Sequence, residues 1–242
     1  MKKIAIVLFN LGGPDALDAV QPFLFNLFND KAIIRAPQPF RWLIAKLIST
    51  RRAPIAREIY SELGGKSPLL ENTEAQAKAL EDVLGSAYLD REFKCFIAMR
   101  YWHPMAAQTA VAVRDWGADD VVLLPLYPQF SSTTTGSSIE AWQKAAIKAG
   151  LVSDVRGVCC YPENDGFIDA LTDRLQSELA GVESVGAARV LFSAHGLPQQ
   201  IVSGGDPYQW AVERTASAVV ARLDIPTLDW VVSYQSRVGP LE

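Results

Sequence analysis

The sequence has 242 residues and a formal net charge of −4, with 49% hydrophobic and 21% charged residues. This composition is ordinary for a soluble globular protein, and the length allows one large domain or two small ones. The negative net charge argues against a general nucleic-acid binder, which would carry a strongly basic face. No apolar run approaches the roughly 18 residues of a membrane-spanning helix, no signal peptide is recognisable, and the three cysteines (Cys95, Cys159 and Cys160) lack metal-binding spacing. We therefore expect a cytoplasmic protein with reduced cysteines.

The first expected strand covers residues 3–9, an apolar run rich in β-branched side chains. It ends in the loop 10–14, after which Asp15 is expected to cap a helix that runs to about Phe28. The two glycines of this loop, Gly12 and Gly13, do not form the G-x-G-x-x-G pattern of nucleotide-binding loops. A tight turn is therefore favoured over nucleotide binding.

Residues 40–52 form an apolar stripe with arginine and lysine at its edges. Such a stripe suits a hydrophobic anionic ligand or a membrane surface. The alternative, which the spacing alone favours, is an ordinary amphipathic helix pair with a solvated basic face. Pro54 is expected to open a second helix, which ends at Gly64 and Gly65. A further helix is expected from about residue 67 to 84.

The second expected strand, residues 93–99, is followed by Arg-Tyr-Trp-His-Pro at residues 100–104. A strand-end cluster of this kind can bind a carboxylate through the arginine and a flat apolar ligand through the aromatic rings. The structural alternative is an aromatic plug with Arg100 in an internal ion pair. Residues 106–116 are then expected to form a helix that ends at Gly117.

The third expected strand, residues 120–126, runs into the loop 127–138, which is dense in hydroxyl groups. These hydroxyls can line a polar site or cap the following helix, expected at 139–149.

The second half repeats the alternation of strands and helices. Strands are expected at 155–160, 189–194 and 228–233, and helices at 165–180 and 208–222. Because strands that alternate with helices form parallel sheets, we predict an α/β protein with two similar units in tandem, of three strands each. The predicted domains are residues 1–150 and 151–242.

His195, one of only two histidines in the chain, comes at the end of the expected strand 189–194. In an open parallel α/β sheet, ligands bind outside the carboxyl ends of the strands. An imidazole in that position can bind a metal ion or carry a proton near neutral pH. The alternative is a hydrogen-bonded structural histidine, because fold position alone does not assign function.

Seven stretches, in order and spanning nearly the whole chain, resemble the ferrochelatase family. They are residues 10–14, 51–54 with Tyr60 and 64–68, 99–104, 124–138, 192–198, 205–208 and 233–240. The resemblance implies a lyase, a metal chelatase, that inserts Fe²⁺ into protoporphyrin IX in the last step of haem synthesis. It also implies two tandem, doubly wound, Rossmann-like chelatase domains with a porphyrin cleft between them.

The resemblance implies site residues position by position. His195 matches the histidine at the metal-insertion site, where it would bind the incoming metal or take a proton from a pyrrole nitrogen. Six further residues match positions that contact the porphyrin or line its pocket: Leu11, Arg52, Tyr60, Ser67, Arg100 and Tyr101. On this basis residues 40–52 are interpreted as the lip of the cleft, and a peripheral membrane contact through them stays open.

Family members continue past the position at which this sequence stops, and their later segment supplies a glutamate that faces the histidine. We therefore expect a chain truncated at the C-terminus, with an incomplete second domain. Some members hold an iron–sulfur cluster through cysteines, one of them near residues 131–132, where this sequence has two serines. We expect no cluster and no other resident cofactor, since iron is a substrate. The alternatives are a non-catalytic porphyrin- or haem-binding module and a chelatase for another tetrapyrrole, and the oligomeric state is not indicated.

Overall fold

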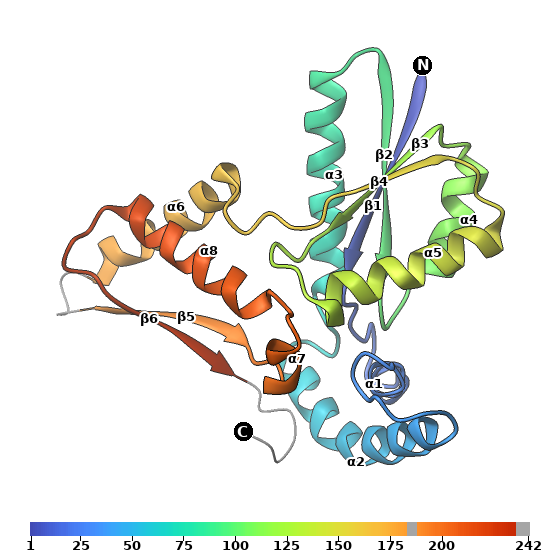
Figure 1. Cartoon of the computed structure of the whole chain (residues 1–242), viewed down its shortest axis with the longest axis horizontal. Helices are drawn as coiled ribbons and strands as arrows, with labels where there is room; N and C mark the ends of the chain where they lie inside the picture. Colours follow the sequence, from blue (N-terminus) through green and yellow to red (C-terminus); the bar gives the residue numbers. More distant parts are fainter. Residues whose placement is uncertain (183–187, 236–242) are drawn as a thin grey trace. The chain divides into compact units, whose positions relative to one another are not determined.

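The structure is a computed structural model that describes residues 1–182 and 188–235 (Figure 1). The chain divides into two compact units. The first contains Met1–Tyr127 and Ser132–Cys159, and the second contains Pro128–Ser131 and the chain from Cys160 onward.

The first unit is built on a four-stranded parallel sheet with the strand order β2-β1-β3-β4. Its elements, in chain order, are β1 (Lys2–Asn10), α1 (Val20–Phe28), α2 (Phe40–Glu62), α3 (Leu69–Ala87), β2 (Arg91–Met99), α4 (Ala106–Trp116), β3 (Asp120–Pro125), the π-helical turn η1 (Ser132–Gly136), α5 (Ser137–Ala149) and β4 (Asp154–Gly157).

Helices cover both faces of this sheet, so the unit is doubly wound (Figure 1). Alternate residues of β1 point to opposite faces, as in any strand. Val7 and Phe9 pack with Val113 of α4 and Trp142 of α5 on one face, and Leu8 packs towards α3 on the other. The predicted α/β class with parallel sheets is confirmed.

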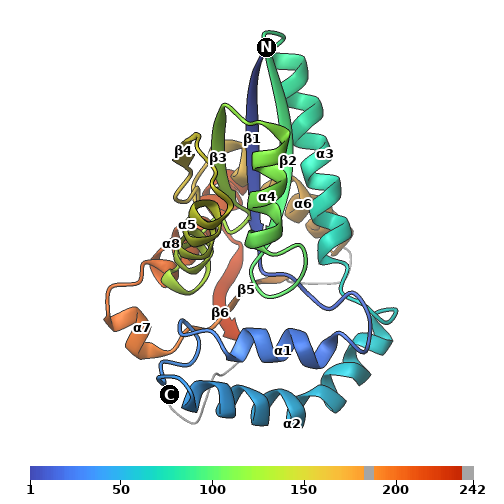
Figure 2. The same cartoon turned by 90° about the vertical axis from the view of Figure 1, so that its right-hand side faces the viewer.

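The strands end level with one another at the carboxyl edge of the first sheet. Asn10 of β1 lies opposite Met99 of β2, and Phe9 lies opposite Pro125 of β3. Beyond this edge, α1 and α2 run side by side (Figures 1 and 2), with the rings of Phe25 and Trp42 in edge contact at 6.0 Å. The residues that follow the strands therefore lie on the side where parallel sheets bind ligands.

The second unit contains a pair of parallel strands, β5 (Arg189–His195) and β6 (Asp229–Gln235), with His195 opposite Gln235. Its helices are α6 (Asp165–Val182), α7 (Gln199–Ser203) and α8 (Tyr208–Leu223). Side chains along α8 are buried at helical spacing, as they are along α5 of the first unit. Along β5 burial alternates residue by residue, because only one face of the β5–β6 pair is covered.

The expectation of three strands in each half is wrong. The strand expected at 155–160 is shorter, β4, and it pairs with β3 in the first sheet, with Val155 opposite Val121. Its own side chains are exposed, because it forms the edge of that sheet. The first sheet therefore has four strands, and the second has two among the described residues.

Two helix boundaries also differ from the expectation. The first helix begins at Val20 instead of Asp15, because residues 15–19 form turns and Ala19 takes the N-cap position. Pro54 does not open a new helix, since α2 runs unbroken from Phe40 to Glu62. Small buried residues one helical turn apart lie on the inward side of α2 up to the proline (Ala45, Ser49 and Ala53), and half-buried Ala56 and Tyr60 continue that side past it. This packing overrides the local signal.

Other expectations are confirmed. The helix 106–116 is α4, and Gly117 ends it with a φ of 75°, in the left-handed region that favours glycine. No helix within the described residues is both long and apolar enough to cross a lipid bilayer.

Candidate functional site

Backbone hydrogen bonds extend the pairing of β1 and β2 beyond the strands themselves. The N–H of Arg100 donates to the carbonyl of Asn10, and the N–H of Tyr101 donates to the carbonyl of Leu11, each at 2.9 Å. Leu11 is thus held beside Tyr101 at the carboxyl edge of the first sheet. Its side chain is about one-third exposed, as expected for an apolar wall of a binding surface.

Close chain packing requires the two glycines after β1. Gly12 has a φ of +85°, and a Cβ there would lie 2.9 Å from the backbone nitrogen of Trp102. A Cβ at Gly13 would overlap the hydroxyl of Ser67, whose N–H donates to the carbonyl of Pro14 at 2.8 Å. The glycines therefore bring Ser67 against the strand end, which agrees with the tight-turn interpretation.

Asp30 is the centre of the polar network at this edge. Its Oδ2 accepts hydrogen bonds from Arg100 Nη2 at 2.6 Å, Tyr101 Oη at 2.9 Å and Ser137 Oγ at 3.1 Å. Its Oδ1 accepts from the N–H of Ala32 at 3.0 Å. Arg100 Nε also donates to Ser137 Oγ, at 2.7 Å. One buried carboxylate therefore ties together three segments that are distant in sequence.

Burial determines the protonation state of the side chains in this network. The side chain of Asp30 is 5% exposed and that of Arg100 is 24% exposed, while Tyr101 is 1% exposed. Burial, and next the negative charge of Asp30, raise the pKa of the Tyr101 phenol well above its usual value, so it stays protonated and donates. The internal ion pair considered for Arg100 is present, and Tyr101 points into the network with it.

Arg52 and Tyr60 lie on α2. The guanidinium of Arg52 is exposed and lies 5.6 Å from the centre of the Phe28 ring, a cation–π arrangement. Tyr60 is half-buried, and this burial raises the pKa of its phenol. Its carbonyl accepts a hydrogen bond from the N–H of Gly65 at 2.7 Å, which closes the end of the helix.

The exposed face of α2 is unusually apolar. While small residues face inwards, large apolar side chains more than 35% exposed recur at helical spacing on the outside: Phe40, Leu43, Ile44, Leu47 and Ile55. Arg51 is exposed on the same stripe, in the gap between Leu47 and Ile55. We call this surface the outer face of α2. A contiguous exposed apolar stripe of this kind marks an interaction surface.

His195 is the last residue of β5 in the second unit and is exposed. The chain turns directly after it, where the N–H of Gly196 donates to the carbonyl of Gln235 at 2.7 Å. Tyr208 is held nearby. Burial raises the pKa of its phenol, and a hydrogen bond with the His195 backbone opposes that rise. The backbone of His195 is therefore fixed on both sides, while its imidazole is directed to the exposed face.

His195 is the predicted metal ligand of this site. Within the described residues, no group of three or more His, Cys, Asp or Glu side chains could hold a metal ion. A substrate metal at this imidazole would take its other ligands from water, from the macrocycle or from outside the described residues.

The structure sorts the predicted residues into three places. Four lie at or next to the carboxyl edge of the first sheet (Leu11, Ser67, Arg100 and Tyr101), two lie on α2 (Arg52 and Tyr60), and His195 lies in the second unit. Sequence reasoning missed Asp30. The available signal was a lone acidic residue next to Lys31, between two apolar stretches.

Known proteins give a consistent answer about the family. The ferrochelatase family profile matches residues 3–242. The chain is 48% identical over 242 residues to the ferrochelatase of Pelagibacter ubique, and 52% and 54% identical over 245 and 241 residues to the ferrochelatases of Hyphomonas neptunium and Caulobacter vibrioides. The alignments cover 100% of this chain and 69%, 66% and 68% of those relatives. The chain thus spans about two thirds of their length, and it belongs to the ferrochelatase family.

Proposed function

We propose that this protein inserts Fe²⁺ into protoporphyrin IX to form haem, the last step of haem synthesis, with iron and the porphyrin as its substrates. The observation that carries the proposal is the match to the ferrochelatase family along residues 3–242. In the reaction one Fe²⁺ enters the macrocycle and two pyrrole protons leave it. The protein must therefore hold a flat apolar disc, deliver a metal and accept protons.

His195 is the proposed catalytic residue and metal ligand. A neutral imidazole can bind Fe²⁺ as it loses water, or accept a pyrrole proton. The support is its exposed position at the carboxyl end of β5 and its backbone, which hydrogen bonds hold in place. An imidazole presented in this way is available to a ligand without prior unfolding.

The porphyrin would contact Leu11, Arg52, Tyr60 and Ser67, with Arg100 and Tyr101 nearby. A porphyrin is an apolar plate with anionic propionates at its edge, so apolar walls edged by cations suit it. The support is the exposed apolar side chain of Leu11 and the exposed guanidinium of Arg52. Because Tyr101 is buried against Asp30, its part is to position Arg100.

We also propose that the protein is cytoplasmic and makes a peripheral membrane contact through residues 40–52. The support is the outer face of α2, where large apolar side chains are exposed beside Arg51 and other cations. Leu47→Ser should weaken sedimentation with anionic lipid vesicles several-fold, since it removes an apolar contact from this surface. Val83→Ser, which removes an exposed apolar side chain from α3, is the control and should sediment like the wild type. Equal sedimentation of both variants and the wild type would contradict the membrane contact.

No iron–sulfur cluster is part of the proposal. Ser131 and Ser132 occupy the region where cluster-binding relatives have a cysteine, and the Ser131 hydroxyl already donates to Asp206 at 3.0 Å. Purified protein should contain no acid-labile sulfide, and stoichiometric sulfide would overturn this part.

The test of the function is porphyrin titration combined with a metal-insertion assay, using Fe²⁺ or Zn²⁺, on a protein extended to the full length of its relatives, of which these 242 residues span about two thirds. His195→Ala should bind porphyrin, seen as a shift of the Soret band, but should lose insertion by orders of magnitude. The matched control is His103→Ala, which removes the chain's other histidine. Its ring contacts Gln108 at 2.8 Å, and we expect insertion to persist.

The other outcomes are informative. Porphyrin binding without insertion by a wild-type protein that spans the full length of its relatives would favour a non-catalytic porphyrin-binding module. Insertion into a different tetrapyrrole only would favour a related chelatase. Near-normal turnover in His195→Ala would contradict the role of that residue.

A further inference from the structure

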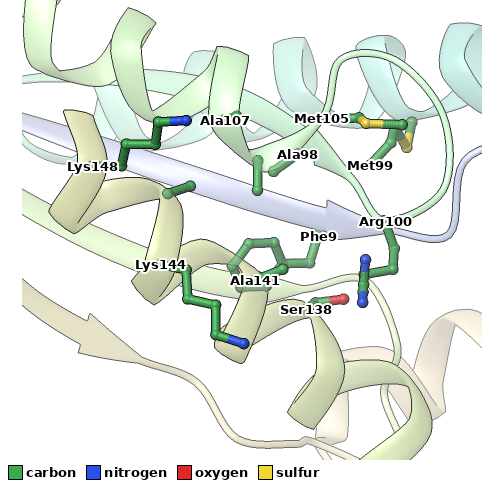
Figure 3. Close-up of a pocket in the computed structure, with 12 residues that line it drawn as sticks. Phe9, Ala98, Met99, Arg100, Met105, Ala107, Ser138, Ala141, Lys144 and Lys148 are labelled. Atoms are coloured by element: carbon green, nitrogen blue, oxygen red, sulfur yellow. The ribbon is translucent and has the colours of Figure 1, made fainter. Parts of the chain in front are cut away.

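A pocket of about 300 Å³ lies between α4 and α5, on the face of the first sheet opposite α3 (Figure 3). Its floor is formed by residues at the carboxyl ends of β1 and β2, and its walls by the two helices. The lining residues used below are Phe9, Ala98, Ala107, Ala141, Lys144 and Lys148.

The inside of the pocket is apolar because small side chains line it. Ala107 of α4 and Ala141 of α5 face the space from opposite helices, and their side chains end at Cβ (Figure 3). Phe9, at the bottom, is 1% exposed and packs edge-on against Trp142 at 6.2 Å. The floor is therefore fixed, and the space above it is available to a ligand. The volume is at the small end of the range for ligand pockets.

The rim of the pocket carries excess positive charge. Lys144 and Lys148 lie one turn apart on α5, and their ammonium groups point away from one another (Figure 3). Glu140 Oε1 is the acceptor for both Lys144 Nζ and Lys31 Nζ, each at 2.7 Å. These two hydrogen bonds lower the pKa of Glu140 to about 2. One carboxylate thus serves two lysines, and Lys148 has no ion-pair partner within the described residues.

The cation at the inner end of the pocket is already bound by other side chains, so it does not attract an anionic ligand. Arg100 lines this end, and its guanidinium already donates to Asp30 at 2.6 Å and to Ser137 at 2.7 Å. An anionic group would therefore bind at the rim, where Lys148 is available, and an apolar group would lie inside.

We propose that the pocket between α4 and α5 binds a small monocarboxylate with an unbranched apolar body, its carboxylate at Lys148 and its body in the space between Ala107 and Ala141. This site is separate from the proposed haem-forming function and does not depend on it. At about 30 Å³ for each water-sized group, the pocket holds a ligand of about ten non-hydrogen atoms. Octanoate has this size and chemistry, so it is the probe.

The test is calorimetric titration of the 242-residue chain with octanoate, and with 1-octanol as the uncharged analogue of equal length. Octanoate should bind about tenfold more tightly than 1-octanol, because only the carboxylate gains from Lys148. Lys148→Gln should remove most of that difference. Ala107→Phe should weaken both ligands about tenfold or more, because the ring would fill the space.

Lys78→Gln is the matched control, since this lysine is on α3, away from the pocket, and forms an exposed ion pair with Asp82 at 3.1 Å. It should bind octanoate like the wild type. Thermal unfolding without ligand establishes that each variant is folded. If Ala107→Phe does not fold, the affinity of Lys148→Gln for octanoate tests the proposal alone. The proposal is overturned if octanoate does not bind, if neither variant changes its affinity, or if protoporphyrin IX displaces it competitively.

Discussion

The carboxyl ends of the two parallel sheets differ in how their polar side chains are satisfied. At the end of the first sheet, Asp30 collects hydrogen bonds from Arg100, Tyr101 and Ser137, all from inside the same unit. At the end of β5, the imidazole of His195 is exposed, and no hydrogen bond of its ring is found among the described residues. A buried group that its neighbours bind holds the fold, whereas an exposed group is available to a ligand. The carboxyl ends of the two sheets thus differ in role: the first stabilises the fold, and the second presents a side chain to a ligand.

The largest effect should follow from Asp30→Asn. The change removes the charge that compensates Arg100 and leaves the guanidinium partly buried, so the free energy of unfolding should fall by about 2–4 kcal/mol. This is below the loss for a fully buried pair, because 24% of the Arg100 side chain is exposed. Urea denaturation monitored by circular dichroism measures it.

The control for this change is Asp82→Asn, which breaks the exposed pair of Lys78 and Asp82 on α3. Its effect should stay within about 0.5 kcal/mol. If Asp30→Asn were equally mild, Asp30 would not be the centre of the network.

A smaller effect is expected from Tyr101→Phe, which removes one donor to Asp30 and leaves the others. The loss should be about 1–2 kcal/mol at neutral pH. The pH dependence gives a second measurement. Because the phenol's pKa is raised in the folded state, the unfolded chain releases this proton first, at about pH 10.

Stability from Tyr101 is therefore full below about pH 10 and is lost as the pH rises above it. Tyr101→Phe should show a shallower decline between about pH 10 and 12, by up to about 1.4 kcal/mol per pH unit. Parallel curves for the variant and the wild type would mean that the buried phenol is not linked to folding.

The smallest effect on stability should come from His195→Ala. Since the imidazole is exposed, the free energy of unfolding should change by no more than about 0.5 kcal/mol, although we expect metal insertion to be lost. Thermal unfolding of the purified variant checks this. A fall of about 2 kcal/mol or more would mean that His195 supports the fold, and the contrast between the two sheet ends would disappear.

Local patterns predicted much of this fold. The helix 106–116 and the strand 120–126 were predicted from hydrophobic periodicity and from Gly117, which ends the helix between them. The sheet to which each strand belongs was less predictable, because an apolar run does not indicate which strand it pairs with. The strand expected in the second domain is β4, which pairs with β3 of the first sheet. The continuity of α2 past Pro54 depends on packing along one side of the helix, from buried Ala45 and Ala53 to half-buried Ala56, and no local rule anticipates this packing.

Asp30 could not be predicted for a related reason. Its partners are 70, 71 and 107 residues away in sequence, so only the folded arrangement identifies them. His195 was easier to find, since its position depends on one strand and the turn after it. Local features of a candidate site are therefore accessible from the sequence, and networks between distant segments are not.

The reversed distribution of side chains on α2, with alanine and serine inside and phenylalanine and leucine outside, also has a practical consequence. Water must solvate a surface that other helices bury, and sulfate or phosphate at high concentration makes this less favourable. Precipitation should therefore begin at this surface, and a mild detergent below its micellar concentration should delay it. Handling of the purified protein thus depends on a helix that contributes little to its core.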